Sequence, residues 1–173
     1  MNVLELFKPI TTFVFDVDGV LTDSTVLLLE NGLQARRMHI KDGLGLQMAI
    51  RNGFRVVVIS GGNSKPVVER LNKLGITDVY ISIDDKKEFL SNYLTKNELK
   101  WEELLFMGDD LPDLAAMKAA GVSACPADAV NEIKETAKYI SHLDGGGGCV
   151  RDIIEKVLKV QDKWIFDNTV TSR

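Results

Sequence analysis

Two aspartates at a spacing of two, Asp16 and Asp18, directly follow the short apolar run Phe13–Phe15. A run of this length is typical of a buried strand, and strand geometry places residues i and i+2 on the same side. Gly19 then lets the chain turn without a side chain in the way. Because carboxylates at the carboxyl end of a buried strand lie where open α/β sheets bind ligands, this stretch predicts a catalytic or metal-binding site. Alone, it also fits a plain strand that ends in an Asp-Gly turn.

A hydroxyl and several glycine amides follow another apolar run, in the stretch Ser60-Gly61-Gly62-Asn63-Ser64. A helical pattern comes next, so the backbone N–H groups and the positive end of that helix favour a bound phosphate. We therefore expect Ser60 and Gly61 to bind phosphate. An ordinary strand-to-helix turn is the alternative.

Lys86 begins a further helical pattern, within the stretch Asp84-Asp85-Lys86-Lys87. A lysine among carboxylates and a phosphate reduces their mutual repulsion as a point charge. We expect Lys86 to take this role. Lys87 is its rival, and a solvated charged surface is the alternative.

Three carboxylates in five residues, Asp109, Asp110 and Asp113, follow the predicted strand Leu104–Met107. They repel one another unless a metal ion or a lysine is near. Mg²⁺ suits such a group, because it prefers oxygen ligands, takes one or two carboxylates and keeps waters and a phosphate oxygen. An acidic helix start is the alternative, since aspartate favours helix N-termini.

Together these four stretches predict phosphoryl transfer. One carboxylate attacks phosphorus and forms an aspartyl-phosphate, which splits hydrolysis into two easier steps. The attacking anion approaches an anionic phosphate, so a metal ion and a lysine must screen the charge. A second carboxyl group protonates the leaving oxygen and later activates water.

The elements that must position these residues alternate between apolar runs and helical patterns. This alternation predicts an α/β fold with a doubly wound, Rossmann-like parallel sheet. The predicted strands are Phe13–Val17, Arg55–Ser60, Val79–Ile81, Leu104–Met107, Val122–Ala124 and Tyr139–Ile140. The predicted helices are Leu44–Asn52, Pro66–Leu74, Lys86–Thr95, Asp113–Ala120 and Val150–Val160. With no dividing linker, we expect one domain over residues 1–173.

A β-hairpin over about residues 26–39 interrupts the alternation. Its arms, Val26–Glu30 and Leu33–His39, flank Asn31-Gly32, the strongest short-range signal for a hairpin. The first arm contains Val-Leu-Leu-Leu and is apolar on both faces. An isolated two-stranded hairpin is marginally stable in water, and an exposed apolar patch usually marks an interface. We therefore expect the hairpin to pack against other subunits.

The composition argues against several partners. A net charge of −4 without a basic stripe disfavours nucleic acid, and no apolar run is long enough to span a bilayer. The first residues lack the pattern of a signal peptide, so we expect a cytoplasmic protein whose two cysteines are free thiols. The segment 161–173 holds Trp164 and Phe166 among polar residues. It is either a tail that docks on another surface or a disordered segment.

The four stretches resemble, in order, the four motifs of the haloacid dehalogenase superfamily phosphatases, over about residues 12–145. The matching residues are Asp16-x-Asp18-Gly-Val-x-Thr-Asp, Ser60, Lys86 and Gly108-Asp109-Asp110-x-x-Asp113. The resemblance implies that Asp16 is the nucleophile and Asp18 the general acid and base. It also implies that Ser60 binds phosphate and that Lys86 holds both the nucleophile and the phosphate.

The same resemblance implies one Mg²⁺ cofactor. Its ligands would be Asp16, the backbone carbonyl of Asp18, and Asp109. Asp113 would support these ligands without binding the metal, and Asp110 is the alternative ligand.

A closer resemblance is to the 3-deoxy-D-manno-octulosonate 8-phosphate phosphatase subfamily. It rests on the short chain, the hairpin in place of a cap domain, and the stretch Gly145-Gly-Gly-Gly-Cys-Val-Arg151-Asp152. The resemblance implies a capless homotetramer with active sites at subunit interfaces, a phosphorylated sugar acid as substrate, and a role in lipopolysaccharide biosynthesis. Arg151 aligns with an arginine of the subfamily and is the predicted contact to the substrate carboxylate. The alternative for Arg151 is a surface ion pair with Asp152 or Glu155.

Two alternatives stay open. Gly62 stands where relatives often carry Arg or Glu, so 2-keto-3-deoxynononate 9-phosphate is a second possible substrate. Receiver domains of signalling proteins also use aspartate, Ser/Thr, lysine and Mg²⁺ on a doubly wound sheet. In receiver domains the acidic pair follows the first strand and the phosphorylated aspartate a middle one, whereas here the Asp-x-Asp pair comes first and the acidic cluster late. That order favours the phosphatase over a signalling or interaction domain without steady turnover.

Overall fold

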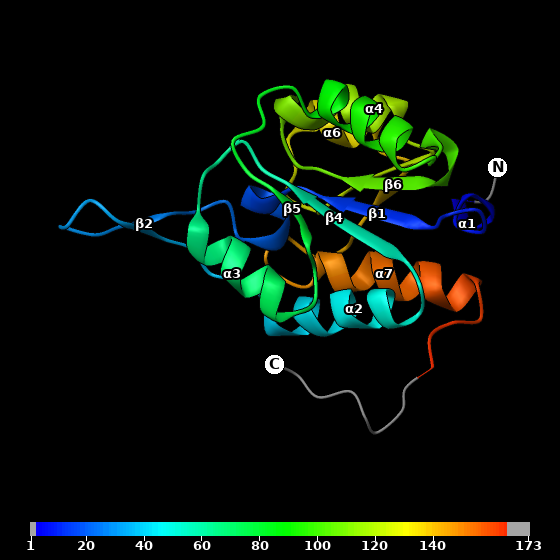
Figure 1. The fold of residues 1–173 in the computed structure, drawn as a ribbon, viewed down its shortest axis with the longest axis horizontal. Helices are drawn as coiled ribbons and strands as arrows, with labels where there is room; N and C mark the ends of the chain where they lie inside the picture. Colours follow the sequence, from blue (N-terminus) through cyan, green and yellow to red (C-terminus); the bar gives the residue numbers. More distant parts are fainter. Residues whose placement is uncertain (1–2, 166–173) are drawn as a thin grey trace.

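A six-stranded sheet forms the centre of the molecule (Figure 1). The structure is a computed structural model that describes residues 3–165. The strand order is β5-β4-β1-β6-β7-β8, and every neighbouring pair is parallel. The strands are β1 (Thr12–Phe15), β4 (Arg55–Ile59), β5 (Asp78–Tyr80), β6 (Leu104–Met107), β7 (Val122–Cys125) and β8 (Tyr139–Ile140). The chain moves outward from β1 to β5, returns to β6 and moves outward again to β8. This doubly wound order confirms the predicted fold class.

Helices cover both faces of the sheet (Figure 1). One face is covered by α2 (Ile40–Arg51), α3 (Lys65–Lys73) and α7 (Cys149–Val160). The other is covered by α4 (Lys86–Lys96), α5 (Leu114–Ala119) and α6 (Asn131–Thr136). Successive side chains of β1 point to opposite faces: Phe13 and Phe15 join the core under α2 and α7, and Val14 joins the core under α4 and α5. Both faces of β1 are therefore dry, and its carboxyl end is held rigidly.

The predicted elements agree with the structure to within a few residues, with three exceptions. The short helix α1 (Val3–Leu6) and the helix α6 are not predicted, and α2 begins at Ile40, four residues before its predicted start at Leu44. The missed first turn of α2 contains Gly43, and glycine is a poor helix former. A Cβ at Gly45 would lie 3.1 Å from the Cα of Arg151, so this glycine lets α2 pack closely on α7.

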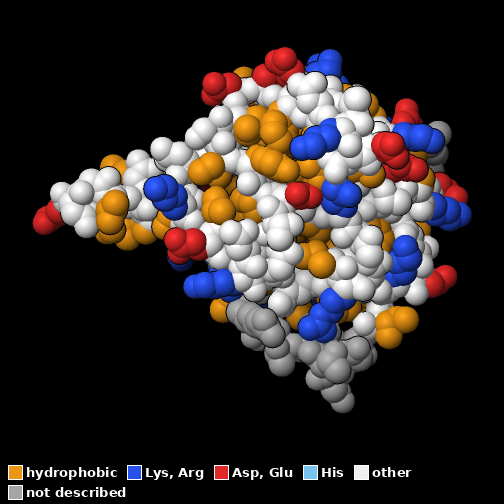
Figure 2. All heavy atoms as spheres, viewed as in Figure 1, with side chains coloured by type: hydrophobic (Ala, Val, Ile, Leu, Met, Phe, Trp, Pro, Cys, Tyr) orange, Lys and Arg blue, Asp and Glu red, His pale blue; other side chains and the backbone are white. Residues whose placement is uncertain are grey.

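The predicted hairpin is present and projects from the body (Figures 1 and 2). Its paired segments, β2 (Leu27–Leu28) and β3 (Gln34–Ala35), are antiparallel and shorter than the predicted arms. The loop is closed by the Leu29 N–H, which donates to the Leu33 carbonyl at 2.9 Å, and Gly32 takes a left-handed φ of +80°. This is a three-residue loop with one left-handed residue.

The hairpin exposes its leucines. Leu27 and Leu28 are 63% and 71% exposed, and Leu33 is 63% exposed. Hydrophobic side chains accordingly gather along the projection in Figure 2. The predicted apolar patch thus exists on the single chain.

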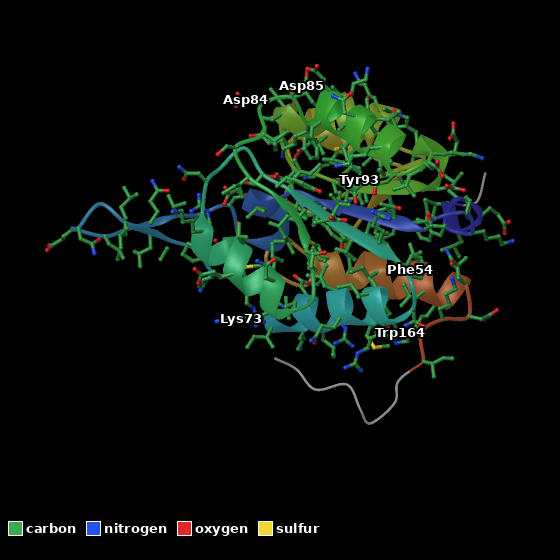
Figure 3. All side chains as sticks on the ribbon, in the orientation of Figure 1. Phe54, Lys73, Asp84, Asp85, Tyr93 and Trp164 are labelled. Atoms are coloured by element: carbon green, nitrogen blue, oxygen red, sulfur yellow. The ribbon has the colours of Figure 1, made fainter. Side chains whose placement is uncertain are left out.

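The segment after α7 turns back onto the body. The Gln161 side-chain amide donates to the carbonyls of Phe7 and Ile10 at 2.9 and 2.8 Å. The Trp164 ring lies 5.5 Å from the guanidinium carbon of Arg151 (Figure 3). The described part of the predicted docking tail therefore docks on its own chain, whereas Phe166 and the residues after it lie outside the described residues. Within residues 3–165, no helix has the length and apolar character needed to cross a membrane.

Candidate active site

A pocket of about 460 Å³ opens at the carboxyl ends of β1, β4 and β6. It gathers the predicted site residues of all four motifs. These residues are Asp16, Asp18, Ser60, Gly61, Lys86, Asp109, Asp110 and Asp113. The parallel strands therefore bring these residues together at one edge of the sheet.

Lys86 lies at the centre of the polar group. Its Nζ donates to Asp16 Oδ1 at 2.7 Å and to Asp113 Oδ1 at 2.6 Å. The Lys86 residue is only 5% exposed. Burial alone would lower the pKa of Lys86, but the charges of Asp16 and Asp113 outweigh it and raise that pKa, so the ammonium stays charged.

The start of α4 places Lys86, and not its rival Lys87, among the described residues that line the pocket. The Asp85 carboxylate accepts from the Glu88 N–H at 2.8 Å and caps the helix. Asp84 and Asp85 lie in the loop immediately before α4 (Figure 3). With the helix fixed at this point, Lys86 points inward and Lys87 is exposed.

Asp113 supports the other groups with both of its oxygens. One oxygen binds Lys86, and the other accepts from the backbone N–H of Asp109 at 3.0 Å. Asp16, Asp109 and Asp113 each place a carboxylate oxygen within 4.8 Å of the others. Because Asp113 is already engaged twice, Asp16 and Asp109 carry the oxygens that are left for a cation.

The pKa values of these two carboxylates record the crowding. Burial, followed by the charge of Asp113, raises the pKa of Asp16 to about 6, although Lys86 acts in the opposite direction. Burial, followed by the charge of Asp16, raises the pKa of Asp109 to about 7. A single lysine thus does not offset the negative charge of the cluster, and a bound cation would do so.

Gly19 allows the loop after β1 to touch Asp109. We call residues 16–23 the catalytic loop. Gly19 has a φ of +93°, and a Cβ on it would lie 1.9 Å from Asp109 Oδ2. No other residue type fits this position, because any side chain would collide with that carboxylate.

The glycine-rich stretch packs against the back of the catalytic loop. A Cβ on Gly145 would lie 2.0 Å from the Gly19 carbonyl oxygen. The Gly146 N–H donates to the Val20 carbonyl at 3.0 Å, and the Gly145 N–H donates to Asp128 at 2.9 Å. These glycines therefore support the catalytic loop from a distant part of the sequence.

Ser60 stands at the end of β4 and is buried. Its Oγ accepts from the Gly62 N–H at 3.0 Å. A Cβ at Gly62 would lie 3.4 Å from Ser60 Oγ and 3.5 Å from Asp18 Oδ2, which is ordinary contact. The position thus has room for a side chain between Ser60 and Asp18, and this chain leaves that room open.

Asp110 lines the pocket but is exposed. Its carboxylate accepts from the Leu111 N–H at 2.7 Å and caps the short helical turn Leu111–Asp113. The capping role matches the alternative interpretation of this stretch as an acidic helix start, and Asp109 is the one of the two that groups with Asp16 and Asp113.

Arg36 is a site residue that the sequence does not predict. Its Nε donates to Asp18 Oδ1 at 2.5 Å and its Nη2 to Asp18 Oδ2 at 3.4 Å. The next residue, Arg37, binds Asp23 Oδ2 through Nη2 at 2.7 Å. The returning arm of the hairpin therefore holds the catalytic loop at two points. No local signal marks such a pair, because the two residues meet only when the hairpin folds back.

Arg151 lies outside this pocket within one chain. It lines a second cavity of about 630 Å³, and its Nε lies 3.5 Å from Glu155 Oε2. The ion pair predicted as the alternative is thus present. The backbone N–H of Arg151 donates to the buried Asp42 at 2.7 Å. A contact between Arg151 and substrate would need a second chain and stays a prediction.

Comparisons with known proteins agree with this geometry. A family model described as haloacid dehalogenase-like hydrolase matches residues 71–150. The 3-deoxy-D-manno-octulosonate 8-phosphate phosphatase KdsC of Salmonella typhi is 32% identical over 162 residues, which cover 94% of this chain and 86% of that protein.

Solved structures extend the likeness to the fold. A 3-deoxy-D-manno-octulosonate 8-phosphate phosphatase from Moraxella catarrhalis, solved with magnesium, phosphate and a KDO molecule, superposes with a TM-score of 0.91. It is 31% identical, over 94% of this chain and 93% of that one. The enzyme of the same name from Yersinia pestis gives a TM-score of 0.91 at 31% identity, over 93% and 87% of the two chains. The chain therefore belongs to the 3-deoxy-D-manno-octulosonate 8-phosphate phosphatase family of the haloacid dehalogenase-like hydrolases.

Proposed function

We propose that this protein is a magnesium-dependent phosphatase that hydrolyses 3-deoxy-D-manno-octulosonate 8-phosphate through an aspartyl-phosphate on Asp16. The observation that carries the proposal is the buried Lys86, which joins Asp16 to Asp113 beside Asp109. The relative from Moraxella catarrhalis, solved with magnesium, phosphate and KDO, supports the choice of cofactor and substrate.

The residues fit Mg²⁺. Asp16 and Asp109 offer carboxylate oxygens, and burial raises the pKa of both, so a divalent cation would relieve their repulsion. The backbone carbonyl of Asp18 is the third proposed ligand. When bound, the ion neutralises charge on the phosphoryl oxygens and on the attacking carboxylate.

Asp16 is the proposed nucleophile. One of its oxygens is held by Lys86 at 2.7 Å, which leaves the other to attack phosphorus. The new bond joins that oxygen to phosphorus while the bond between phosphorus and the sugar oxygen breaks. Lys86 then lies beside both the phosphoryl group and the carboxyl group that carries it, and Ser60 and Gly61 contact the phosphoryl oxygens.

Asp18 is the proposed general acid and base. It gives its proton to the leaving sugar oxygen and so releases the free sugar acid. It then takes a proton from the water that attacks phosphorus. The bond between Asp16 and phosphorus breaks, inorganic phosphate leaves, and both aspartates return to their starting states.

A second candidate substrate, 2-keto-3-deoxynononate 9-phosphate, is favoured by Gly62. A side chain at this position would reach between Ser60 and Asp18, where the leaving sugar must lie. Without it, the pocket has room for a longer sugar acid.

A panel of phosphorylated sugar acids tests the proposal. Phosphate release from each is measured as kcat/KM, with and without Mg²⁺. We expect the octulosonate ester to give the highest value, chelation to abolish turnover, and Asp16→Asn to lower kcat by several orders of magnitude in a folded protein. Near-normal turnover by Asp16→Asn, or full activity after exhaustive chelation, contradicts the mechanism. A higher kcat/KM for the nononate ester transfers the assignment to the second candidate.

We further propose a cytoplasmic homotetramer in which the hairpins of several subunits pack together. The exposed leucines of the hairpin support this assembly. Burying about 400 Å² of apolar surface per subunit contributes on the order of 10 kcal/mol before association costs. In such a tetramer, Arg151 of a neighbouring subunit is the proposed contact to the sugar-acid carboxylate. Two buried free thiols, Cys125 and Cys149, suit a reducing compartment.

A further inference from the structure

We propose that Arg36 is the positioning residue of the general acid and base Asp18, so that the hairpin forms part of the catalytic machinery. The inference rests on the proposed function. It adds a residue from an element that lies outside the four motifs.

The contact is bidentate. Arg36 donates Nε to one oxygen of Asp18 and Nη2 to the other, at 2.5 and 3.4 Å. Two donors of a rigid guanidinium fix the plane of a carboxylate as well as its distance, which a single donor cannot do. A general acid must stand within hydrogen-bond reach of the oxygen that it protonates. The orientation of Asp18 is therefore a catalytic requirement that Arg36 meets.

Arg36 lies next to the substrate pocket, in a small recess that it shares with Asp18, Ser60 and Gly62. The side chain of Arg36 is only 12% exposed, whereas that of Asp18 is 40% exposed. Asp18 lines the pocket of about 460 Å³, and Arg36 is absent from the described residues around it. In the proposal, Arg36 therefore acts through Asp18.

Gly62 lies beside this arrangement. A Cβ at position 62 would lie 3.5 Å from Asp18 Oδ2 and 3.8 Å from Arg36 Nη2. A long charged side chain at that position would compete with Arg36 for Asp18 or displace the guanidinium. The glycine at position 62 and the arginine at position 36 thus belong to one arrangement.

The hairpin carries a matched control. Arg37 follows Arg36, pairs with Asp23 through an 89% exposed side chain, and does not touch Asp18. Replacing Arg37 removes the other ion pair between the hairpin and the catalytic loop and leaves the contact to Asp18 intact. Arg36→Met and Arg37→Met therefore separate positioning of Asp18 from support of the hairpin.

The experiment measures kcat and KM for 3-deoxy-D-manno-octulosonate 8-phosphate with wild type, Arg36→Met, Arg36→Lys and Arg37→Met. We expect Arg36→Met to lower kcat about 10- to 100-fold, since misplacing a catalytic group costs this much, while KM changes by less than about 3-fold because uniform binding is kept. Arg36→Lys should recover part of the loss through one remaining hydrogen bond. Arg37→Met, which removes an exposed ion pair at the far end of the loop, should lower kcat much less than Arg36→Met.

A second measurement distinguishes positioning from a general loss of structure. The release of the alcohol in the first turnover is compared for the sugar ester and for 4-nitrophenyl phosphate, whose leaving group departs without a proton. Arg36→Met should slow the first-turnover release of the sugar acid much more than that of 4-nitrophenol. Equal slowing of both, an equal loss in Arg37→Met, or a raised KM at unchanged kcat overturns the proposal.

The controls on folding and on the proposed function are separate. If Arg36→Met does not fold, the test rests on Arg36→Lys. A kcat equal to wild type, together with an unchanged ratio of the two first-turnover rates, overturns the proposal. A lowered kcat with a changed ratio supports it. An inactive wild type overturns the proposed function and this inference with it. An active wild type with an equally active Arg36→Met overturns this inference alone.

Discussion

In the metal-free protein, raising the pH from 5 to 8 should lower the free energy of unfolding, because the carboxylates of the site must lose protons inside a crowded pocket. Burial raises the pKa of Asp16 from 3.8 to about 6 and that of Asp109 from 3.8 to about 7. Between the two pKa values of each group, the folded state binds more protons than the unfolded state. The contribution of these two carboxyl groups to the free energy of unfolding is therefore fully present below pH 3.8 and is lost as the pH rises through 6 and 7.

The size of the effect follows from the same pKa values. Asp16, with a folded pKa of about 6, loses roughly 1.4 kcal/mol between pH 5 and pH 8, since a tenfold difference in proton affinity between the folded and unfolded states is worth about that much. For Asp109 the loss extends from pH 5 to its folded pKa of about 7, but this carboxylate is only half-buried. Because water screens the charge of Asp109, we count only half of the loss expected for a fully buried group, which leaves about 1.4 kcal/mol. A sum of roughly 3 kcal/mol lowers the Tm of a domain of this size by about 6–12 °C.

Mg²⁺ isolates the contribution of the site. Burial also raises the pKa of Asp42, which lies outside the metal cluster and acts in the same direction with or without the ion. Thermal unfolding is measured at pH 5, 6, 7 and 8 in EDTA and in Mg²⁺, for wild type and Asp109→Asn. We expect Mg²⁺ to flatten the slope of the wild type, and Asp109→Asn to have about half the wild-type slope in EDTA. A metal-free Tm that stays level or rises from pH 5 to pH 8, with no response to Mg²⁺, refutes the reasoning.

Three further changes have defined outcomes. Lys86→Met should abolish turnover and, by leaving buried carboxylates unpaired, destabilise the metal-free protein at pH 8 by about 3 kcal/mol, whereas the exposed Lys87→Met should change neither; equal losses in kcat or Tm contradict the assignment of Lys86. Replacing Leu27 and Leu29 with serine should give smaller species in analytical ultracentrifugation and lower turnover of the sugar ester more than that of 4-nitrophenyl phosphate; an active wild-type monomer at micromolar concentration refutes the assembly. Gly145→Ala should lower both Tm and kcat, because its Cβ would lie 2.0 Å from the backbone of the catalytic loop, and unchanged values of both would show that this packing is unimportant.

The pocket could be predicted because its residues stand where apolar runs end. Asp16, Ser60 and Asp109 each follow a buried strand, and parallel strands bring their carboxyl ends to one edge. The hairpin was equally visible, because its Asn-Gly signal is local. These predictions depend on short stretches of chain, so they need no knowledge of distant contacts.

The residues that escaped prediction depend on contacts between distant segments. Arg36 meets Asp18 only after the hairpin folds back, and nothing in its neighbours marks that contact. In α6 only Ile133 is buried, so its sequence carries little helical periodicity. The first turn of α2 was missed because the predicted helix began only at Leu44, although the prediction did include Gly45, which the close approach of α7 requires.

The packing of the glycine-rich stretch on the catalytic loop has a consequence for protein synthesis. The Cys149 thiol donates to the Val20 carbonyl across 129 positions of the chain. During translation, the proposed nucleophile Asp16 therefore leaves the ribosome early, and the glycine-rich stretch that supports its loop leaves only much later. A nascent or truncated chain that ends before Gly145 contains all four motifs, but its catalytic loop lacks that backing. Hydrolytic activity should thus appear only when translation has passed these glycines.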